Sequence, residues 1–126
     1  MLSGAEYVGF IPITDVARAR DFYTGFLGLR VLEESPAALV LDANGTMLRL
    51  TPIHGHQPRP GTIAGWAVQD MKAAINELTA AGVQFNRYDG MEQDIDGVWI
   101  SPSGAQVAWF DDPDGNTLSL TTFPKA

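Results

Sequence analysis

Arg49 and Ser119 are the two polar side chains whose placement most suggests chemistry, because they occupy equivalent positions in two similar segments. At an offset of 70 residues, five residues of the first segment match five of the second: Asp42, Gly45, Leu48, Leu50 and Thr51 match Asp112, Gly115, Leu118, Leu120 and Thr121. Arg49 falls on Ser119 at this offset. A guanidinium can grip a carboxylate through two hydrogen bonds, whereas a serine offers one hydroxyl. The matching segments predict that the chain contains two copies of one unit.

The other polar candidates are weaker. His54 and His56 form a His-x-His pair, but no third ligand lies nearby in the sequence and the pair sits in a Gly/Pro-rich segment, so we interpret it as solvated. Most carboxylates fall in expected caps, turns and an acidic loop from Asp89 to Gly97, where solvation explains them. No Ser-His-Asp order with supporting motifs is present. We therefore assign no catalytic residue.

Composition narrows the function classes. A chain of 126 residues with 45% apolar residues is long enough for one domain with a core. A net charge of -7 argues against nucleic acid as a partner. The sequence has no apolar run of membrane-spanning length, no signal-peptide pattern and no cysteine, so we expect a cytoplasmic protein without membrane contact, disulfides or thiolate chemistry.

In the first unit we expect a strand, then a helix and then three strands. Thr14 and Asp15 are good helix N-cap types, and Gly28 is a plausible residue just past the helix end. Between them, apolar residues recur at helical spacing to about Leu27. The expected strands are Tyr7 to Ile13, Leu29 to Glu34, Ala37 to Asp42 and Thr46 to Pro52.

The second unit repeats this order after a linker, residues 53–61. Asp70 is expected to cap a helix that stops near Gly82, at the place that matches Asp15. The expected extended segments are Thr62 to Val68, Val83 to Tyr88, Val98 to Ser101, Ala105 to Phe110 and Asn116 to Thr122. Asp-Pro-Asp-Gly at 112–115 predicts the turn before the last strand. The sequence therefore predicts one α+β domain, residues 1–126, built from two βαβββ modules at 7–52 and 62–122.

These motifs resemble the vicinal oxygen chelate superfamily, which includes glyoxalase I, bleomycin-resistance proteins and extradiol dioxygenases. Three stretches carry the likeness: residues 10–29 with Phe22-Tyr23 and Leu27-Gly28-Leu29, the second module start at Ile63 to Asp70, and Ala108 to Asn116 with Asp-Pro-Asp-Gly-Asn. The resemblance implies that the two modules form a half-open curved sheet with the ligand in its concavity. It also implies a homodimer.

In metal-dependent members, the resemblance places four ligands on the first and last strands of the two modules. Carried over by position, these places hold Val8, Arg49, Ile63 and Ser119. Valine and isoleucine have no donor atom, a guanidinium repels a cation, and serine alone is a poor ligand. We therefore expect no metal and no cofactor at this site, which removes the main basis for glyoxalase or dioxygenase chemistry.

Strand alternation predicts the side chains that would line the concavity. The predicted ligand-binding residues are Val8, Phe10, Met47, Arg49, Thr51, Ile63, Val107, Trp109 and Ser119. This mix suits a small, partly aromatic ligand with one anionic or carbonyl group. The alternative is that Arg49 pairs with an internal acidic residue. Trp66 is expected to point to the helix side and join the core, whereas the position of Trp99 is left open between the pocket mouth and a dimer contact.

Three functions compete. The first is a small-molecule binding protein like the bleomycin-resistance proteins. The second is an enzyme of lyase or isomerase type with a metal-independent or relocated site, with His54, Arg49 and Tyr88 as its polar groups. The third is a scaffold for dimer-mediated interaction. We favour the first, because the missing ligands and the aromatic walls both fit it.

Overall fold

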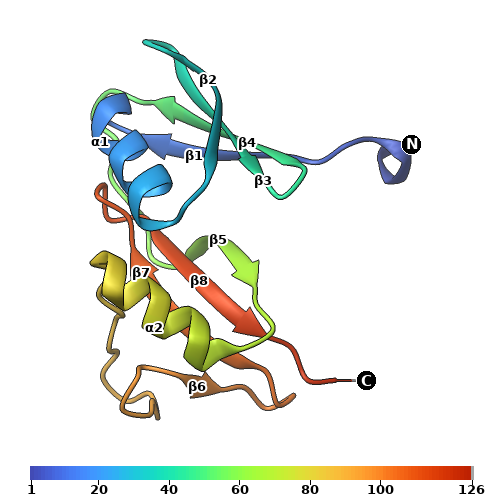
Figure 1. Ribbon diagram of the computed structural model, residues 1–126, viewed down its shortest axis with the longest axis vertical. Coiled ribbons are helices and arrows are strands. Elements are labelled where there is room, and N and C mark those ends of the chain that lie inside the picture. The colour runs from blue at the N-terminus through green and yellow to red at the C-terminus, as the bar shows by residue number, and fades with distance from the viewer. Residues whose placement is uncertain (126) are drawn as a thin grey trace. The chain divides into compact units, whose positions relative to one another are not determined.

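The structure is a computed structural model that describes residues 1–125, and it divides into two compact units at Gln57 and Pro58 (Figure 1). The boundary lies inside the 53–61 segment. Ala126, the last residue of the expected domain, lies outside the described residues. No helix among residues 1–125 has the length and apolar character needed to cross a membrane.

The first unit contains one helical segment and four strands. After a short 3-10 turn, η1 (Leu2–Gly4), come β1 (Val8–Ile13), α1 (Val16–Arg20), η2 (Asp21–Phe26), β2 (Arg30–Ser35), β3 (Ala38–Ala43) and β4 (Thr46–Pro52). The expected N-cap is confirmed, because the Asp15 carboxylate accepts a hydrogen bond from the backbone N–H of Arg18. Gly28 ends the segment at a φ of +76°, which glycine adopts without strain.

The helical segment is not uniform, although the sequence predicts one helix to about Leu27. It begins as the α-helix α1 and continues as the π-helix η2. The Thr24 hydroxyl donates to the carbonyl oxygen of Arg20 at 2.6 Å, where the two forms meet. Such back-bonding by a hydroxyl competes with regular helical hydrogen bonds, a local effect that apolar spacing does not reveal.

The second unit has the same order of elements, except that residues 83–88 do not form a strand. Its elements are β5 (Thr62–Ala67), α2 (Met71–Ala81), β6 (Trp99–Ile100), β7 (Gln106–Asp111) and β8 (Thr117–Thr122). Asp70 caps α2 by accepting from the N–H of Ala73, and Gly82 ends it in the left-handed conformation. In the turn before β8, the Asp112 carboxylate accepts from the N–H groups of Asp114 and Asn116, so these residues form the turn as expected.

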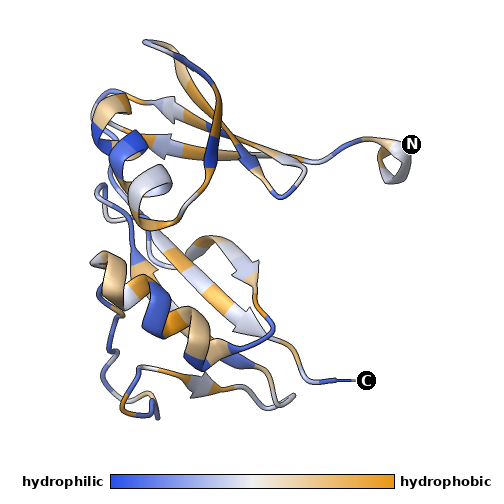
Figure 2. Ribbon diagram, viewed as in Figure 1, coloured by the Kyte–Doolittle hydropathy of each residue, from blue (hydrophilic) through white to orange (hydrophobic). Residues whose placement is uncertain are grey.

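The two sheets have one topology. Their strand orders are β1-β4-β3-β2 and β5-β8-β7-β6, with the first and last strands of each unit paired in parallel. This arrangement confirms an α+β fold of two similar modules. Each sheet packs one face against its helix, and the alternation of apolar and polar residues that this requires is visible along β8 in Figure 2.

The buried side chains identify the helix-covered faces. In the first unit they include Ile11, Ile13, Leu39, Leu41, Leu48 and Leu50 with Ala19, Phe22 and Tyr23, and in the second Ala108, Phe110, Leu118 and Leu120 with Met71 and Ile75. Alternate residues of the strands therefore occupy the other face of each sheet, which we call the helix-free face. Trp66 pairs with Leu120 on the helix side and is half-buried.

The predicted strand from Val83 to Tyr88 is wrong. Only Phe85 makes a ladder contact, an isolated bridge to Phe110. The Gln93 side chain takes the hydrogen bonds that a neighbouring strand would make, because it donates to the Asn86 carbonyl and accepts from the Tyr88 N–H. The outer edge of β7 is consequently shared between Phe85 and the two-residue strand β6.

Candidate functional site

The nine predicted ligand-binding residues fall on the helix-free faces of the two sheets. Val8, Phe10, Met47, Arg49 and Thr51 lie on β1 and β4, and Ile63, Val107, Trp109 and Ser119 lie on β5, β7 and β8. The strand registers bring the members of each group side by side within their own sheet, except Ile63, which has no register partner because the pairing of β5 with β8 shifts between Thr62 and Ala64. Each face is therefore described separately.

On the first sheet, one row across the strands contains Phe10, Arg49 and Val40 as successive register partners. The Phe10 ring is 65% exposed. Nη1 of Arg49 lies 3.8 Å from the Met47 sulfur, so the guanidinium leans along β4 toward Met47. No carboxylate of residues 1–125 lies within ion-pair distance of Arg49. The expected alternative, an internal ion pair, is therefore absent from the described part of the chain.

A hollow of about 420 Å³ lies on the first unit, next to this row. Its lining residues come from the segment before β1, from β1 and β2, and from the hairpin of β3 and β4: Glu6, Tyr7, Val8, Leu32, Asp42, Gly45, Thr46 and Met47. Only Val8 and Met47 belong to the predicted set. Sequence reasoning missed the others, because most of them lie before β1, on β2 or on the β3–β4 hairpin, and alternation within one strand does not show which neighbouring segments complete a hollow.

On the second sheet, the equivalent row contains Gly65, Ser119 and Trp109. The Trp109 side chain crosses the central strand β8, because its indole Nε1 donates to the Thr62 hydroxyl on β5 at 3.0 Å. Ser119 lies on β8, between the strands that carry Trp109 and Thr62, and is only 8% exposed. The Trp109 indole therefore covers Ser119 on the second sheet, whereas the equivalent position on the first sheet holds the accessible side chain of Arg49.

Two further aromatic rings flank Trp109. Tyr88 meets it edge-on with ring centroids 5.7 Å apart, and Trp99 lies 6.0 Å away. The Tyr88 hydroxyl accepts from the Asn86 amide, which also donates to Asp111. Trp99, whose place the sequence left open, thus belongs to an aromatic cluster on the helix-free face of its own sheet.

The four positions that the resemblance assigns to metal ligands do not fit a divalent cation. Val8 and Ile63 present no donor atom, Arg49 carries a permanent positive charge, and the neutral Ser119 hydroxyl is buried. Among residues 1–125, no three His, Cys, Asp or Glu side chains lie close enough together to hold a metal ion. His54 is exposed in the segment after β4. We derive no reaction step through a metal at this site.

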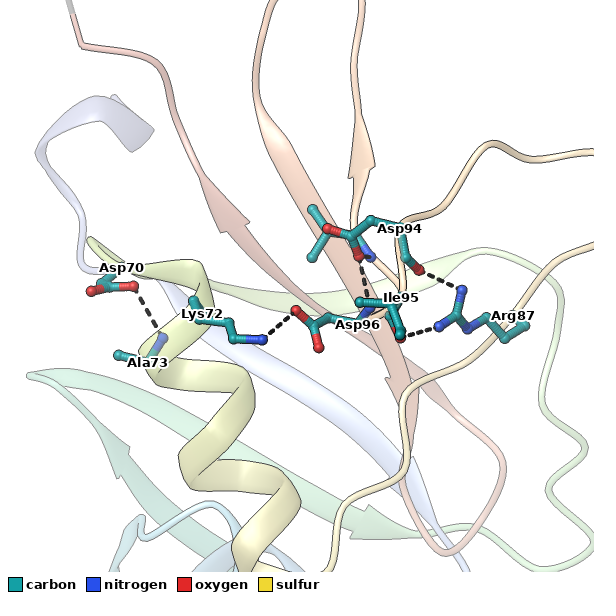
Figure 3. Close-up of polar contacts among 8 residues, drawn as sticks. Asp70, Lys72, Ala73, Arg87, Asp94, Ile95 and Asp96 are labelled. Carbon is teal, nitrogen blue, oxygen red and sulfur yellow. Dashed lines mark hydrogen bonds and ion pairs between the residues drawn. The ribbon is translucent and has the colours of Figure 1, made fainter.

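The acidic loop is held in place by hydrogen bonds and an ion pair of its own residues (Figure 3). Arg87 donates to the carbonyl oxygens of Asp94 and Ile95, and the Asp94 carboxylate accepts from the N–H groups of Asp96 and Val98. Asp96 pairs with Lys72 on α2 at 2.8 Å. The hydrogen bond from Lys72 to Asp96 raises the pKa of the lysine ammonium. The Asp94 carboxylate thus orders the backbone of the loop, and Asp96 holds the loop on α2.

The sequence matches the family model described as Glyoxalase/Bleomycin resistance protein/Dioxygenase superfamily over residues 5–120. No curated protein matches it. A solved member of that superfamily from Sphaerobacter thermophilus has a TM-score of 0.72 and 22% identity, with 97% of this chain and 99% of that chain covered. A glyoxalase/bleomycin resistance protein/dioxygenase from Alicyclobacillus acidocaldarius has a TM-score of 0.71 and 20% identity, with 97% and 93% covered.

An antibiotic binding protein from Streptomyces sp. CB03234 is similar to the same degree. Its TM-score is 0.71 and its identity 21%, with 98% of this chain and 99% of that chain covered. At these identities, the likeness to the solved structures shows the fold alone. The function must therefore be argued from this chain's own residues.

Proposed function

The chain belongs to the Glyoxalase/Bleomycin resistance protein/Dioxygenase superfamily, and we propose that it is a metal-independent binding protein for a small organic molecule. Its binding surface is the helix-free face of the first sheet, built from Val8, Phe10, Met47, Arg49 and Thr51. Ile63, Val107, Trp109 and Ser119 are proposed only as secondary ligand contacts on the face of their own sheet, where the Trp109 indole already covers part of the surface. The ligand carries an anionic or carbonyl group.

The observation that carries this proposal is the free guanidinium of Arg49. Its one hydrogen-bonding contact with another described residue is the weak contact to the Met47 sulfur. A partly buried cation without a partner favours an anion that arrives from outside, and a guanidinium can hold a carboxylate through two parallel hydrogen bonds. The exposed Phe10 ring, its register partner, supplies an apolar or stacking surface beside the charge.

Family membership supports binding but does not name the ligand. One solved relative of this fold is an antibiotic binding protein. A large cationic antibiotic would meet the positive charge of Arg49 at close range, so a neutral or anionic molecule fits this chain better.

We extend the proposal to a cytoplasmic homodimer. Large apolar side chains outside the proposed binding surface are exposed in both units, including Leu2 and Ile53 in the first and Ile95 and Ile100 in the second. Exposed large apolar side chains are candidates for contact with another chain. Light scattering on the purified protein measures the mass directly, and a single species of 13.6 kDa would contradict the dimer.

The binding proposal is tested by calorimetric titration with 4-methylbenzoate, which presents one carboxylate on an apolar ring. Replacing Arg49 with methionine removes the charge but keeps an apolar stem, so we expect affinity to fall about tenfold or more, the effect of losing a hydrogen-bonded charge pair. Arg59→Met is the matched control, because Arg59 is exposed in the segment between the units. Equal affinity in the two variants, or no binding by the wild type, would contradict the proposal.

A further inference from the structure

The hollow of the first unit joins two chemical environments. Val8, Leu32 and Met47 provide apolar side chains, and Tyr7 provides an aromatic ring beside them. Two carboxylates, Glu6 and Asp42, also line the hollow. Its volume of about 420 Å³ lies within the range of roughly 300–1,000 Å³ that is typical of small-molecule pockets.

Leu32 provides an apolar wall on the side of β2. It lines the hollow and is 47% exposed. It lies two residues after Arg30, whose register partner Asp42 also lines the hollow, so strand alternation places it on this face. The register between β2 and β3 shifts between Val31 and Glu33, so Leu32 has no ladder partner of its own.

The two carboxylates differ in how far they are already satisfied. Asp42 pairs with Arg30 at 3.3 Å and accepts from the N–H of Gly45 at 2.7 Å. Glu6 makes no hydrogen bond or ion pair with any residue of 1–125. The side chain of Glu6 is therefore the unpaired negative charge at the hollow.

The unpaired positive charge is Arg49, and the apolar pair Val8 and Met47 separates it from Glu6 along the strands. Val8 and Met47 are register partners, and Glu6 precedes Val8 by two residues, whereas Arg49 follows Met47 by two residues. The Arg49 guanidinium leans back toward Met47, a lining residue of the hollow. The backbone positions are about 13 Å apart along the strands, and the lean of the Arg49 side chain toward Met47 shortens the gap between the charges.

We propose that the ligand of the first sheet is zwitterionic. Its anionic group binds Arg49, its cationic group binds Glu6 beside the Tyr7 ring, and its apolar body covers Val8, Leu32 and Met47. The inference rests on the proposed function, because Arg49 is the anion-binding end of the same surface. Aromatic faces attract cations, so Tyr7 and Glu6 favour the same ligand group. The Arg49 guanidinium lies beside Met47, and Met47 is one alternate-residue spacing, roughly 7 Å, from the level of Glu6 along the strands, so ligand charges about that far apart suit this surface.

Three compounds that share one aromatic ring separate the contributions of the anionic and cationic groups to binding. They are 4-methylbenzoate with the anion alone, 4-methylbenzylamine with the cation alone, and 4-(aminomethyl)benzoate with both. Calorimetric titration of the wild-type protein is expected to show the zwitterion binding about two- to fivefold more tightly than 4-methylbenzoate, the gain typical of one exposed ion pair. Glu6→Gln should remove this gain, so that the variant binds the zwitterion and 4-methylbenzoate with equal affinity. Glu92→Gln is the matched control, an exposed glutamate in the acidic loop of the second unit.

The outcomes distinguish this inference from the proposed function. If 4-methylbenzoate binds in an Arg49-dependent way but the amino group brings no gain, or if Glu6→Gln leaves the gain intact, the zwitterionic ligand is excluded while the anion-binding function stands. If 4-methylbenzoate shows no Arg49-dependent binding, the proposed function fails and the inference fails with it. A gain that depends on Glu6 and not on Glu92 supports both.

Discussion

The two sheets have the same topology but differ in what occupies the central row of the helix-free face. The first row runs Phe10, Arg49 and Val40, and the second runs Gly65, Ser119 and Trp109. In the second row the two small residues leave space for the Trp109 indole to lie across the central strand and reach Thr62. In the first row the central strand carries a charged side chain beside an exposed ring.

This difference shows how one repeated scaffold can give two surfaces of different character. A tryptophan bound to its own sheet covers the second row and reduces the exposure of Ser119. The first row keeps an unpaired cation next to apolar side chains, which favours a ligand over internal packing. The side chain at the central position, and the size of its two neighbours, therefore separate a covered face from a candidate binding face.

The largest expected effect concerns the aromatic residue of each row. Trp109→Ala removes an indole that contacts two other rings and donates to Thr62, so we expect the free energy of unfolding to fall by about 3 kcal/mol. Phe10→Ala removes an exposed ring and should change it by no more than about 0.5 kcal/mol. Urea denaturation measures both. Similar losses in the two variants would erase the distinction between the faces.

The next effect tests whether the second row needs its small residue. A Cβ at Gly65 would collide with the hydroxyl oxygen of Ser119 and approach its carbonyl oxygen to 3.1 Å, so Gly65→Ala is expected to cost about 1–3 kcal/mol. Gly25→Ala is the control, because a Cβ there meets no atom within 4 Å. Thermal unfolding monitored by circular dichroism compares them. An unchanged stability of Gly65→Ala would mean that this row can accommodate a larger side chain than glycine.

The smallest effect concerns the hydrogen bond between the indole and β5. Thr62→Val keeps the shape of the side chain but removes the acceptor for Trp109 Nε1, and we expect a loss of about 1 kcal/mol. Thr51→Val makes the same change on the first sheet, where no hydrogen bond of the Thr51 side chain to a described residue is lost, so stability should stay within about 0.5 kcal/mol. Equal losses would show that this bond does not hold the indole.

Much of the fold could be predicted from local signals. Asp15 and Asp70 cap helices, and Gly28 and Gly82 end them, because these roles depend on one side chain and the nearest backbone. The alternation of side chains along each strand predicted which residues point to each face of the sheet. The expected strand from Val83 to Tyr88 failed because Gln93, outside the segment, takes its hydrogen bonds.

The candidate site was less predictable for the same reason. Alternation placed Arg49 and Trp109 on the helix-free faces, but the tether between Trp109 and Thr62 joins residues 47 positions apart. The hollow is lined by Leu32 on β2, by Glu6 and Tyr7 before β1, and by residues of the β3–β4 hairpin. These features arise from the packing of whole strands, which a pattern within one segment does not encode.

The central claim is that the first sheet, with its unpaired Arg49, is the ligand-binding face. Its most direct test is an amide chemical-shift map of the isotope-labelled protein during titration with 4-methylbenzoate. We predict that the shifts concentrate on β1 and β4 around Phe10 and Arg49 and disappear in Arg49→Met. Shifts that concentrate on Thr62, Trp99 and Trp109, or that persist in Arg49→Met, would contradict the account.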